Sequence, residues 1–168
     1  MNRRTALAVT TVALSGAALS AGAAVAQQRS LKDQLVGTWT LVSQELTPLN
    51  GTKRQIANPK GILMFDAGGR YAYFLVRGDR PKYRSPGAPT TEEIAANVRE
   101  YVAGNFGTWS VNEADKTLTQ HYDGALNPNN DGTEAKATVS LSGDELRLTT
   151  VSPGGSGARA DTVYRRAR

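Results

Sequence analysis

The single histidine of the chain stands two residues from an aspartate, in a segment that alternates apolar and polar side chains. Residues two apart share one face of a strand, so the carboxylate of Asp123 could orient the imidazole of His121 as a general base. The same alternation places Leu118, Gln120 and Tyr122 toward the core and His121 outward. A lone histidine without a nucleophile or metal partner is usually structural, so no catalytic residue is assigned.

The loop after this segment offers oxygen atoms, but not with the spacing of a metal site. Asn127, Asn129 and Asp131 precede Gly132 in a pattern similar to a calcium loop. An acidic first position and a distal bidentate glutamate are both missing. The chain has no cysteine, which excludes thiolate ligands and cysteine nucleophiles. Neither a nucleotide-binding glycine pattern nor a serine-nucleophile motif occurs. The sequence therefore predicts no metal ion and no cofactor.

The remaining candidates for binding are aromatic side chains with polar tips, together with one amide. Such rings offer flat apolar surfaces, and their polar tips can orient a small amphipathic ligand. Strand alternation places the amide of Gln120 inside, where leaving it unpaired costs about 1 to 3 kcal/mol. This favours a neutral, mostly apolar ligand with one or two oxygen atoms over a nucleotide or sugar phosphate. The candidate ligand-binding residues are Tyr71, Tyr73, Trp109, Gln120, Tyr122 and Tyr164.

These candidates stand on segments with the pattern of antiparallel strands. Gly37 followed by Trp39 opens an alternating run that is typical of a first strand. Apolar residues occupy both faces of the hairpin around the turn 66–69, which predicts cover on both sides. The stretch 52–60 is expected to be a long loop, and 152–157 a flexible one. The expected strands are 37–43, 62–65, 71–76, 106–111, 117–123, 135–141, 145–151 and 159–166.

Two helical segments are expected beside the strands. A short turn over 30–36, ended by Gly37, would plug one end of the sheet structure. A longer helix follows the capping box that Thr90 opens, and we expect it to end at Gly104. Its apolar stripe should be buried across a mouth or on an outer wall. The stripe comprises Ile94, Val98, Tyr101 and Val102.

Eight strands joined by mostly short turns suit an up-and-down barrel, because closure leaves no exposed sheet edge. A sandwich of two sheets is the structural alternative. The predicted fold class is all-β: an eight-stranded antiparallel up-and-down barrel with one helix inserted between strands three and four.

The first 26 residues have the composition of an export signal. Arg3 and Arg4 precede the mainly apolar stretch 6–19, and small residues at 24–26 form a cleavage site. A membrane span needs about 20 strongly apolar residues, whereas this run is broken by Thr, Ser and Gly. We therefore expect a signal peptide over 1–26, one domain over 27–168, and a periplasmic or secreted protein without a membrane anchor.

The net charge and the absence of cysteine exclude further classes of partner and of covalent stabilisation. The loss of Arg3 and Arg4 would lower the formal net charge from +5 to +3. No basic cluster exceeds the one at 164–168, which argues against nucleic acid as a partner. Without cysteine the domain has no disulfides, so packing alone must hold it together. The sequence predicts no oligomeric state.

Several short phrases of the chain together resemble one known family. From Leu35 onward the chain resembles the bacterial lipocalin-like domain family, and the matching phrases stand at 35–39, 60–66, 69–71, 106–111, 141–146 and 164–166. The resemblance implies a lipocalin-like barrel whose Gly-x-Trp strand closes the narrow end. It also implies that a last-strand arginine lies across Trp39, and we prefer Arg166 for this structural closure. Arg166 would pair with a fatty-acid carboxylate only if it is not used there. The sequence departs from the family at Asn130, where a tryptophan is expected.

The leading functional prediction is an exported lipocalin-like protein that binds or carries a small hydrophobic molecule in the barrel interior. One alternative is an enzyme acting on such a molecule in the same cavity, which requires an inward His121 or paired acids. The other is a filled barrel that acts through its surface, as an envelope interaction module or inhibitor, which requires a tightly packed interior and an exposed apolar patch.

Overall fold

The computed structural model of the protein describes residues 29–151 and 158–168. The predicted export signal over 1–26 and the predicted loop over 152–157 lie outside the described residues. In the part of the chain that the structure describes, no helix is long and apolar enough to cross a membrane.

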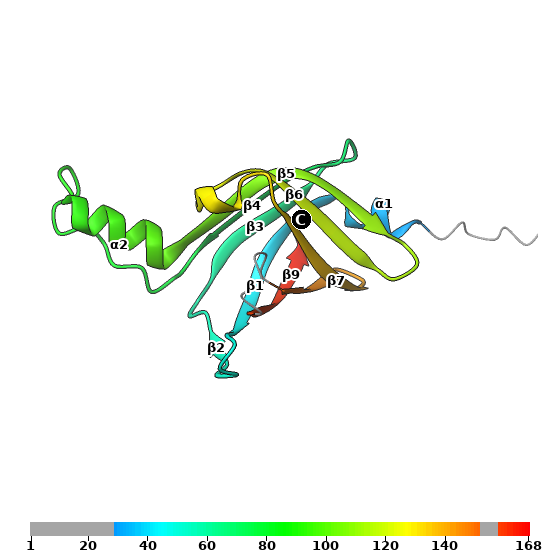
Figure 1. Ribbon diagram of the computed structural model, residues 1–168, viewed down its shortest axis with the longest axis horizontal. Coiled ribbons are helices and arrows are strands. Elements are labelled where there is room, and N and C mark those ends of the chain that lie inside the picture. The colour runs from blue at the N-terminus through cyan, green and yellow to red at the C-terminus, as the bar shows by residue number, and fades with distance from the viewer. Residues whose placement is uncertain (1–28, 152–157) are drawn as a thin grey trace, which may run out of the picture.

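Eight long antiparallel strands form a closed barrel (Figure 1). Each strand pairs with the next along the chain, and β1 pairs with β9 to close the ring. The predicted up-and-down barrel is confirmed, and the two-sheet sandwich is excluded because the pairing of β1 with β9 closes all eight strands into one ring. The barrel strands are β1 (Gly37–Thr47), β3 (Lys60–Phe65), β4 (Arg70–Val76), β5 (Val102–Asn112), β6 (Thr117–Ala125), β7 (Glu134–Ser142), β8 (Glu145–Val151) and β9 (Arg159–Arg166).

A two-residue strand, β2 (Arg54–Gln55), lies within the stretch that was expected to be a long loop. It pairs with the end of β1, which continues four residues beyond the predicted end at Ser43. The backbone N–H of Ile56 donates to the carbonyl of Gln44 over 2.9 Å, and the Ile56 side chain is buried. The free edge of the long β1 therefore holds this segment in an extended form.

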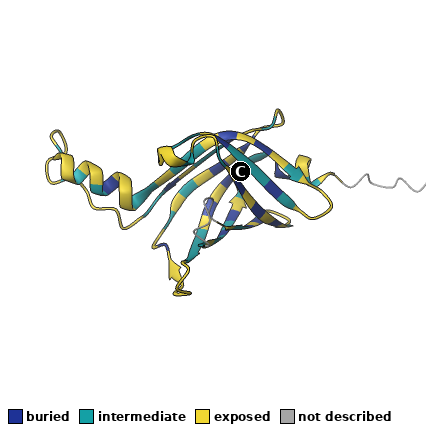
Figure 2. Cartoon of the chain, viewed as in Figure 1, coloured by how far each residue is buried: buried dark blue, intermediate teal, exposed yellow. Residues whose placement is uncertain are grey.

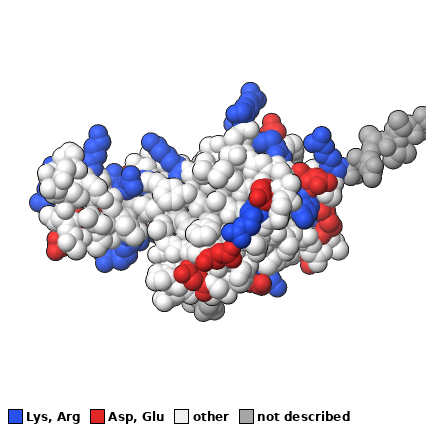
Figure 3. All heavy atoms as spheres, turned by 90° about the horizontal axis from the view of Figure 1, so that it is seen from above, with Lys and Arg blue, Asp and Glu red and all other residues white. Residues whose placement is uncertain are grey.

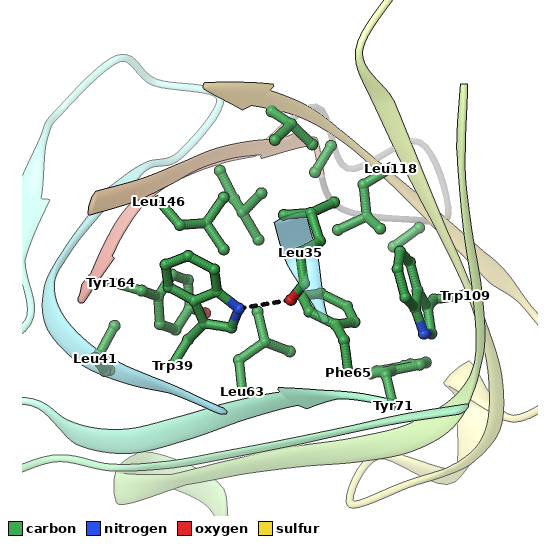
Figure 4. Packing of buried hydrophobic residues seen from close by; sticks show 14 of the residues in the cluster. Leu35, Trp39, Leu41, Leu63, Phe65, Tyr71, Trp109, Leu118, Leu146 and Tyr164 are labelled. Atoms are coloured by element: carbon green, nitrogen blue, oxygen red, sulfur yellow. Dashed lines mark hydrogen bonds between the residues drawn. The ribbon is translucent and has the colours of Figure 1, made fainter. Parts of the chain in front are cut away.

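The narrow end of the barrel is plugged by the helical turn α1 (Leu31–Leu35), as predicted. Ser30 caps the turn through its hydroxyl, which accepts from the backbone N–H of Asp33 over 3.0 Å. The carboxylate of Glu113, in the turn directly after β5, accepts from the first two backbone N–H groups of α1, each over 2.9 Å. Leu35 is fully buried beneath the turn, where it joins the main core cluster (Figure 4).

The hairpin of β3 and β4 is covered on its inner face only. Its inward side chains Leu63, Phe65 and Tyr71 are buried, but its outward side chains Ile62 and Phe74 are 41% and 47% exposed. Figure 2 shows exposed and buried positions alternating along the strands. The prediction of cover on both sides is therefore wrong. An apolar outer face needs a second element to cover it, and no described element of this chain lies over the hairpin there.

The helix α2 (Thr91–Tyr101) lies between β4 and β5, the third and fourth barrel strands, as predicted. Its capping box is complete, with Glu93 N–H donating to the Thr90 hydroxyl and Thr90 N–H donating to the Glu93 carboxylate. The helix ends at Tyr101 rather than at Gly104, because Val102 is already extended and pairs with Val76 of β4.

This helix projects beyond the open end of the barrel, at the left of Figure 1. It lies neither across the mouth nor along the wall. The side chains of Ile94 and Val98 are 43% and 46% exposed, while Asn97 is buried. The expectation that the apolar stripe is buried is wrong for these two residues, because the helix projects beyond the barrel and is not packed closely against its strands.

Candidate functional site

The interior of the barrel contains a cavity of about 120 Å³ toward its open half. An engineered cavity of about 150 Å³ is enough to hold benzene, so this space is close to the size of one ring. Leu63 and Leu148 form part of an apolar wall. Most of the remaining lining consists of eight side chains with polar atoms: Gln44, Tyr73, Asn105, Gln120, Tyr122, Thr150, Thr162 and Tyr164.

Four of the six predicted ligand-binding residues line this cavity. They are Tyr73, Gln120, Tyr122 and Tyr164. The other two, Tyr71 and Trp109, lie in the packed core (Figure 4). The ring of Trp109 lies 4.7 Å from that of Phe65 between centroids, and its indole N–H donates to the carbonyl of Asp66 over 3.2 Å. Trp109 is therefore part of the barrel filling and not of the cavity lining.

Four polar residues of the lining were not among the predicted ligand-binding residues: Gln44, Asn105, Thr162 and Thr150. Gln44 faces inward because the pairing of β1 with β9 shifts between Leu41 and Ser43, which changes the alternation along the strand. Asn105 lies before the predicted start of its strand at Phe106. The third, Thr162, pairs with Gln44 in the register of β1 and β9. The periodicity of β9 places Thr162 on the same face as Tyr164, and this signal could have identified Thr162 as a lining residue.

The polar atoms of the cavity are only partly matched. The amide Nε2 of Gln44 donates to the hydroxyl of Thr162 over 3.1 Å. The side-chain oxygen Oδ1 of Asn105 is buried and accepts no hydrogen bond from any described residue, and the hydroxyl of Tyr71 in the neighbouring core is also unmatched. A buried polar atom without a partner costs about 1 to 3 kcal/mol. Asn105 lines the cavity, so a ligand or a water molecule whose donor reached this oxygen would satisfy it.

The tyrosines that line the cavity are neutral hydroxyls at ordinary pH. Burial raises the pKa of Tyr73 to about 12. It also raises the pKa of Tyr122 and holds the pKa of Tyr164 well above its usual value. No carboxylate or imidazole stands among the described residues that line the cavity. The site therefore offers hydrogen bonds and apolar contact without a charge.

These pKa shifts predict how stability depends on alkaline pH. The folded pKa of Tyr73 lies above the ordinary value of 10, so the folded state keeps its proton longer than the unfolded chain does. This contribution to the free energy of unfolding is complete below pH 10 and falls as pH rises from 10 through 12. Urea denaturation at pH 8 to 12, with tyrosinate absorbance measured in parallel, checks this. A Tyr73→Phe variant should lose less stability over that range, and an equal loss would contradict the assignment to Tyr73.

His121 lies on the outer wall, as alternation predicted, with 45% of its side chain exposed. Its Nε2 is 3.9 Å from the nearer carboxylate oxygen of Asp123. That carboxylate instead accepts from Arg70 over 2.7 Å. The geometry thus places the pair away from the cavity, where it cannot act on a molecule bound inside.

The asparagine-rich loop uses its oxygen atoms to hold its own turn. Asn127 accepts from the backbone N–H of Asn129 over 3.1 Å and begins the short helix η1 (Pro128–Asn130). Asp131 accepts from the backbone N–H of Ala125 over 2.8 Å. Within residues 29–151 and 158–168, no three His, Asp or Glu side chains are grouped to hold a metal ion.

The guanidinium of Arg166 stacks on Trp39 at the narrow end, 4.1 Å from the ring centroid. Its two terminal nitrogens donate to the carbonyls of Val36 and Gln34 over 3.2 and 2.6 Å. The indole N–H of Trp39 donates to the carbonyl of Leu35 over 2.8 Å (Figure 4). Arg166 does not line the cavity, so it supplies no charge there for a fatty-acid carboxylate.

The chain is similar to known proteins in both fold and sequence. A lipocalin-like protein from Bacteroides uniformis is 15% identical over 79% of this chain and 98% of its own, with a TM-score of 0.42. Two variants of the fluorescent protein UnaG, each with one asparagine replaced, are 16% and 14% identical to this chain. They cover 80% and 81% of this chain and 97% and 98% of their own, with TM-scores of 0.35 and 0.34. No protein with a curated description matches the chain. The sequence model of the lipocalin-like domain family matches residues 36–167, which include the whole barrel. The chain therefore belongs to the lipocalin-like domain family.

Proposed function

We propose that this protein binds one small, neutral, ring-sized molecule with one or two oxygen atoms in the open-end cavity of its barrel. The observation that carries the proposal is a ring-sized cavity lined by Asn105, a residue whose Oδ1 is buried and unmatched. Such an acceptor favours a ligand that donates a hydrogen bond, because that bond removes the penalty of an unpaired buried atom.

The rest of the lining supports the same class of ligand. Leu63 and Leu148 give apolar contact, and Gln120 offers a second amide. Neutral tyrosine hydroxyls and the absence of a charged side chain among the described lining residues disfavour an anion, whose desolvation would not be compensated. The volume suits one ring and not a long acyl chain or a retinoid, which need more enclosed space. In keeping with the predicted export signal, we place this binding activity in the periplasm or outside the cell.

The enzyme alternative receives no support from the placement of its residues. It required an inward His121 or a pair of acids beside the cavity. His121 and Asp123 instead lie on the outer wall, so binding without chemical conversion is the simpler function for this cavity.

Calorimetric titration with phenol, benzyl alcohol, toluene and benzoate tests the proposal. We expect the two neutral hydroxyl compounds to bind best, and benzoate to bind weakly or not at all. Replacing Asn105 with leucine, which keeps a similar volume, should weaken phenol binding by about tenfold and leave toluene binding nearly unchanged.

Two further variants complete this experiment. Gln120→Leu tests the second amide of the cavity, and Gln55→Leu is the matched control, because Gln55 is exposed on β2. The proposal fails if no neutral probe binds at millimolar concentration. It also fails if Asn105→Leu and Gln55→Leu affect phenol binding equally.

A further inference from the structure

The surface at the open end of the barrel contains a cleft whose charged lining residues are all basic. The cleft has a volume of about 500 Å³ and lies between the start of β3, the loop that follows β4 and the helix α2. None of its described lining residues is an aspartate or a glutamate. The four cations of this basic cleft, which come from two separate segments of the chain, are Lys60, Arg77, Arg80 and Lys82.

Most of this positive charge is not neutralised within the described chain. Arg77 forms an ion pair with Asp79 over 2.6 Å. Lys60, Arg80 and Lys82 form no ion pair with any described residue. Like charges gathered in a concave surface raise the local concentration of counter-ions, so the basic cleft favours an anion.

The loop that carries three of these cations is held against α2 at two points. The backbone N–H of Arg77 donates to the carbonyl of Tyr101 over 2.8 Å, and its guanidinium lies 5.0 Å from the centroid of that ring. Further along the loop, Nε of Arg84 donates to the carboxylate of Glu93 over 3.2 Å. Asn97 lies between these two points on the helix, where it is buried and lines the cleft. Because the loop is already held in place, binding would not have to order it.

A glycine brings this loop against the segment that supplies the fourth cation. The backbone N–H of Gly78 donates to the carbonyl of Ala57 over 3.2 Å. A Cβ atom at Gly78 would collide with the backbone carbonyl oxygen of Asn58. Glycine therefore permits the close approach that places Lys60, which follows shortly after Asn58, in one cleft with the cations of the loop.

The outer wall of β3–β6 carries an apolar groove of about 560 Å³. Isolated exposed hydrophobic residues are ordinary, but a continuous group of them marks an interaction site. In Figure 3 Lys and Arg side chains predominate at the projecting end at the left, and the neighbouring surface is largely uncharged. The large exposed side chains of this outer groove are Ile62, Met64, Phe74, Phe106 and Leu126.

The outer groove and the basic cleft follow one another along the same two strands. Ile62 of β3 pairs with Phe74 of β4 in the groove, and Lys60 pairs with Val76 in the cleft. The two pairs are two residues apart on each strand, so their side chains share one face and lie about 7 Å apart. A molecule that lies in the outer groove can therefore place its end group in the basic cleft.

The single carboxylate among the described groove residues lies on the opposite side of the groove. Asp131 follows β6, and β4 and β5 separate that strand from β3. Its carboxylate accepts from the backbone N–H of Ala125 over 2.8 Å. An anionic group would be repelled on this side and attracted on the side of Lys60, so the charges specify one direction for a bound molecule.

We propose that the outer groove and the basic cleft together bind a single-chain anionic amphiphile, with its alkyl chain in the groove and its carboxylate or phosphate head in the cleft. Burial of the alkyl chain contributes through the hydrophobic effect, and the cations add charge-assisted hydrogen bonds to the head. This outer site is separate from the cavity inside the barrel, so the inference goes beyond the proposed function and does not rest on it.

The charges of α2 favour a single bound molecule over a flat anionic membrane. The helix carries Glu92, Glu93 and Glu100 against the single Arg99. An anionic membrane would approach the helix together with the cleft, and the helix would be repelled. A single anionic head can instead reach the basic cleft without approaching these carboxylates.

Calorimetric titration with decyl compounds, each below its micelle concentration, tests the outer site. We expect decanoate and decyl phosphate to bind at least about tenfold more tightly than uncharged decyl maltoside, and inorganic phosphate to bind more weakly than decyl phosphate. Added salt should weaken the binding of both decyl anions, because it screens exposed cations. The tighter of the two anions identifies the preferred head group, and either order supports the proposal.

Substitutions in the cleft and the groove locate the site. Lys60→Gln and Lys82→Gln should each weaken decanoate binding by about fivefold, and Ile62→Gln by about tenfold, because it places a polar group against the alkyl chain. Lys136→Gln is the matched control, since Lys136 is exposed on β7 outside both the groove and the cleft. Gln120→Leu, inside the barrel, should leave decanoate binding unchanged. Circular dichroism should show that all these variants remain folded.

Several results would overturn the proposal. Decyl maltoside could bind as tightly as decanoate, or Lys60→Gln and Lys136→Gln could have equal effects. Loss of decanoate binding in Gln120→Leu would instead place decanoate in the barrel cavity. Binding to phosphatidylglycerol vesicles without binding of dissolved decanoate or decyl phosphate would assign the surface to a membrane. A failure of phenol to bind would contradict the function proposed for the cavity and not this outer site.

Discussion

Replacing Trp39 with alanine is expected to lower the free energy of unfolding by about 3 to 5 kcal/mol. The side chain is fully buried in the core cluster at the narrow end of the barrel. Its removal would leave a cavity that the closed ring of strands cannot collapse to fill. The guanidinium of Arg166 would lose its stacking partner, and the carbonyl of Leu35 would lose the indole donor. The cavity, the lost stacking and the lost hydrogen bond all destabilise the narrow end of the barrel.

Chemical denaturation followed by circular dichroism measures this effect. His121→Ala is the comparison, because His121 lies half-exposed on the outer wall and should change stability by no more than about 0.5 kcal/mol. A larger loss for His121→Ala than for Trp39→Ala would show that the inner and outer faces of the strands are assigned the wrong way round.

Replacing Gly107 with alanine is expected to destabilise the protein by about 3 kcal/mol. Gly107 follows an irregularity in the pairing of β5 with β6, where the register shifts between Phe106 and Gly107. A Cβ atom built at Gly107 would collide with the backbone carbonyl oxygen of His121 and come within 2.8 Å of the backbone nitrogen of Asp123. Both contacts are with backbone atoms of the neighbouring strand, so no side chain can rotate away to relieve them.

Gly87→Ala is the matched control for this substitution. No atom lies within 4 Å of a Cβ built at Gly87, and its backbone does not adopt a positive φ. We expect little change or a slight gain in stability there, because alanine restricts the unfolded chain more than glycine does. Equal denaturation midpoints for the two variants would contradict the close approach of β5 and β6 at Gly107.

The irregularity at Gly107 also bears on the cavity. Before the shift, Asn105 faces inward and pairs in register with Ala125. After it, Gly107 stands opposite the buried Tyr122. The placement of the unmatched Asn105 oxygen thus depends on a local break in strand pairing. A variant that forces regular pairing at this point should alter both stability and ligand binding.

The amino-acid sequence by itself determined the strands, the two helical segments and most inward faces. The pattern is strong because side chains alternate with period two, so one buried face specifies the register of each strand. This is why Leu118, Gln120 and Tyr122 were correctly placed inside and His121 outside. The capping residues Ser30 and Thr90 specified where both helices begin, because their hydroxyl groups bond to nearby backbone atoms without help from the rest of the fold.

Only the tertiary structure decided which residues meet in the cavity and which apolar faces stay open. The register shift after Leu41 turns Gln44 inward, and alternation cannot anticipate such a shift because it depends on pairing with a distant strand. Trp109 lies in the packed core rather than beside the cavity because it packs against Phe65, a residue of β3 that is distant in the sequence. The sequence pattern predicted that the outer face of the β3–β4 hairpin and the apolar side of α2 are buried, but both are exposed in this chain. Apolar periodicity identifies an apolar face, and it does not identify the element that covers that face.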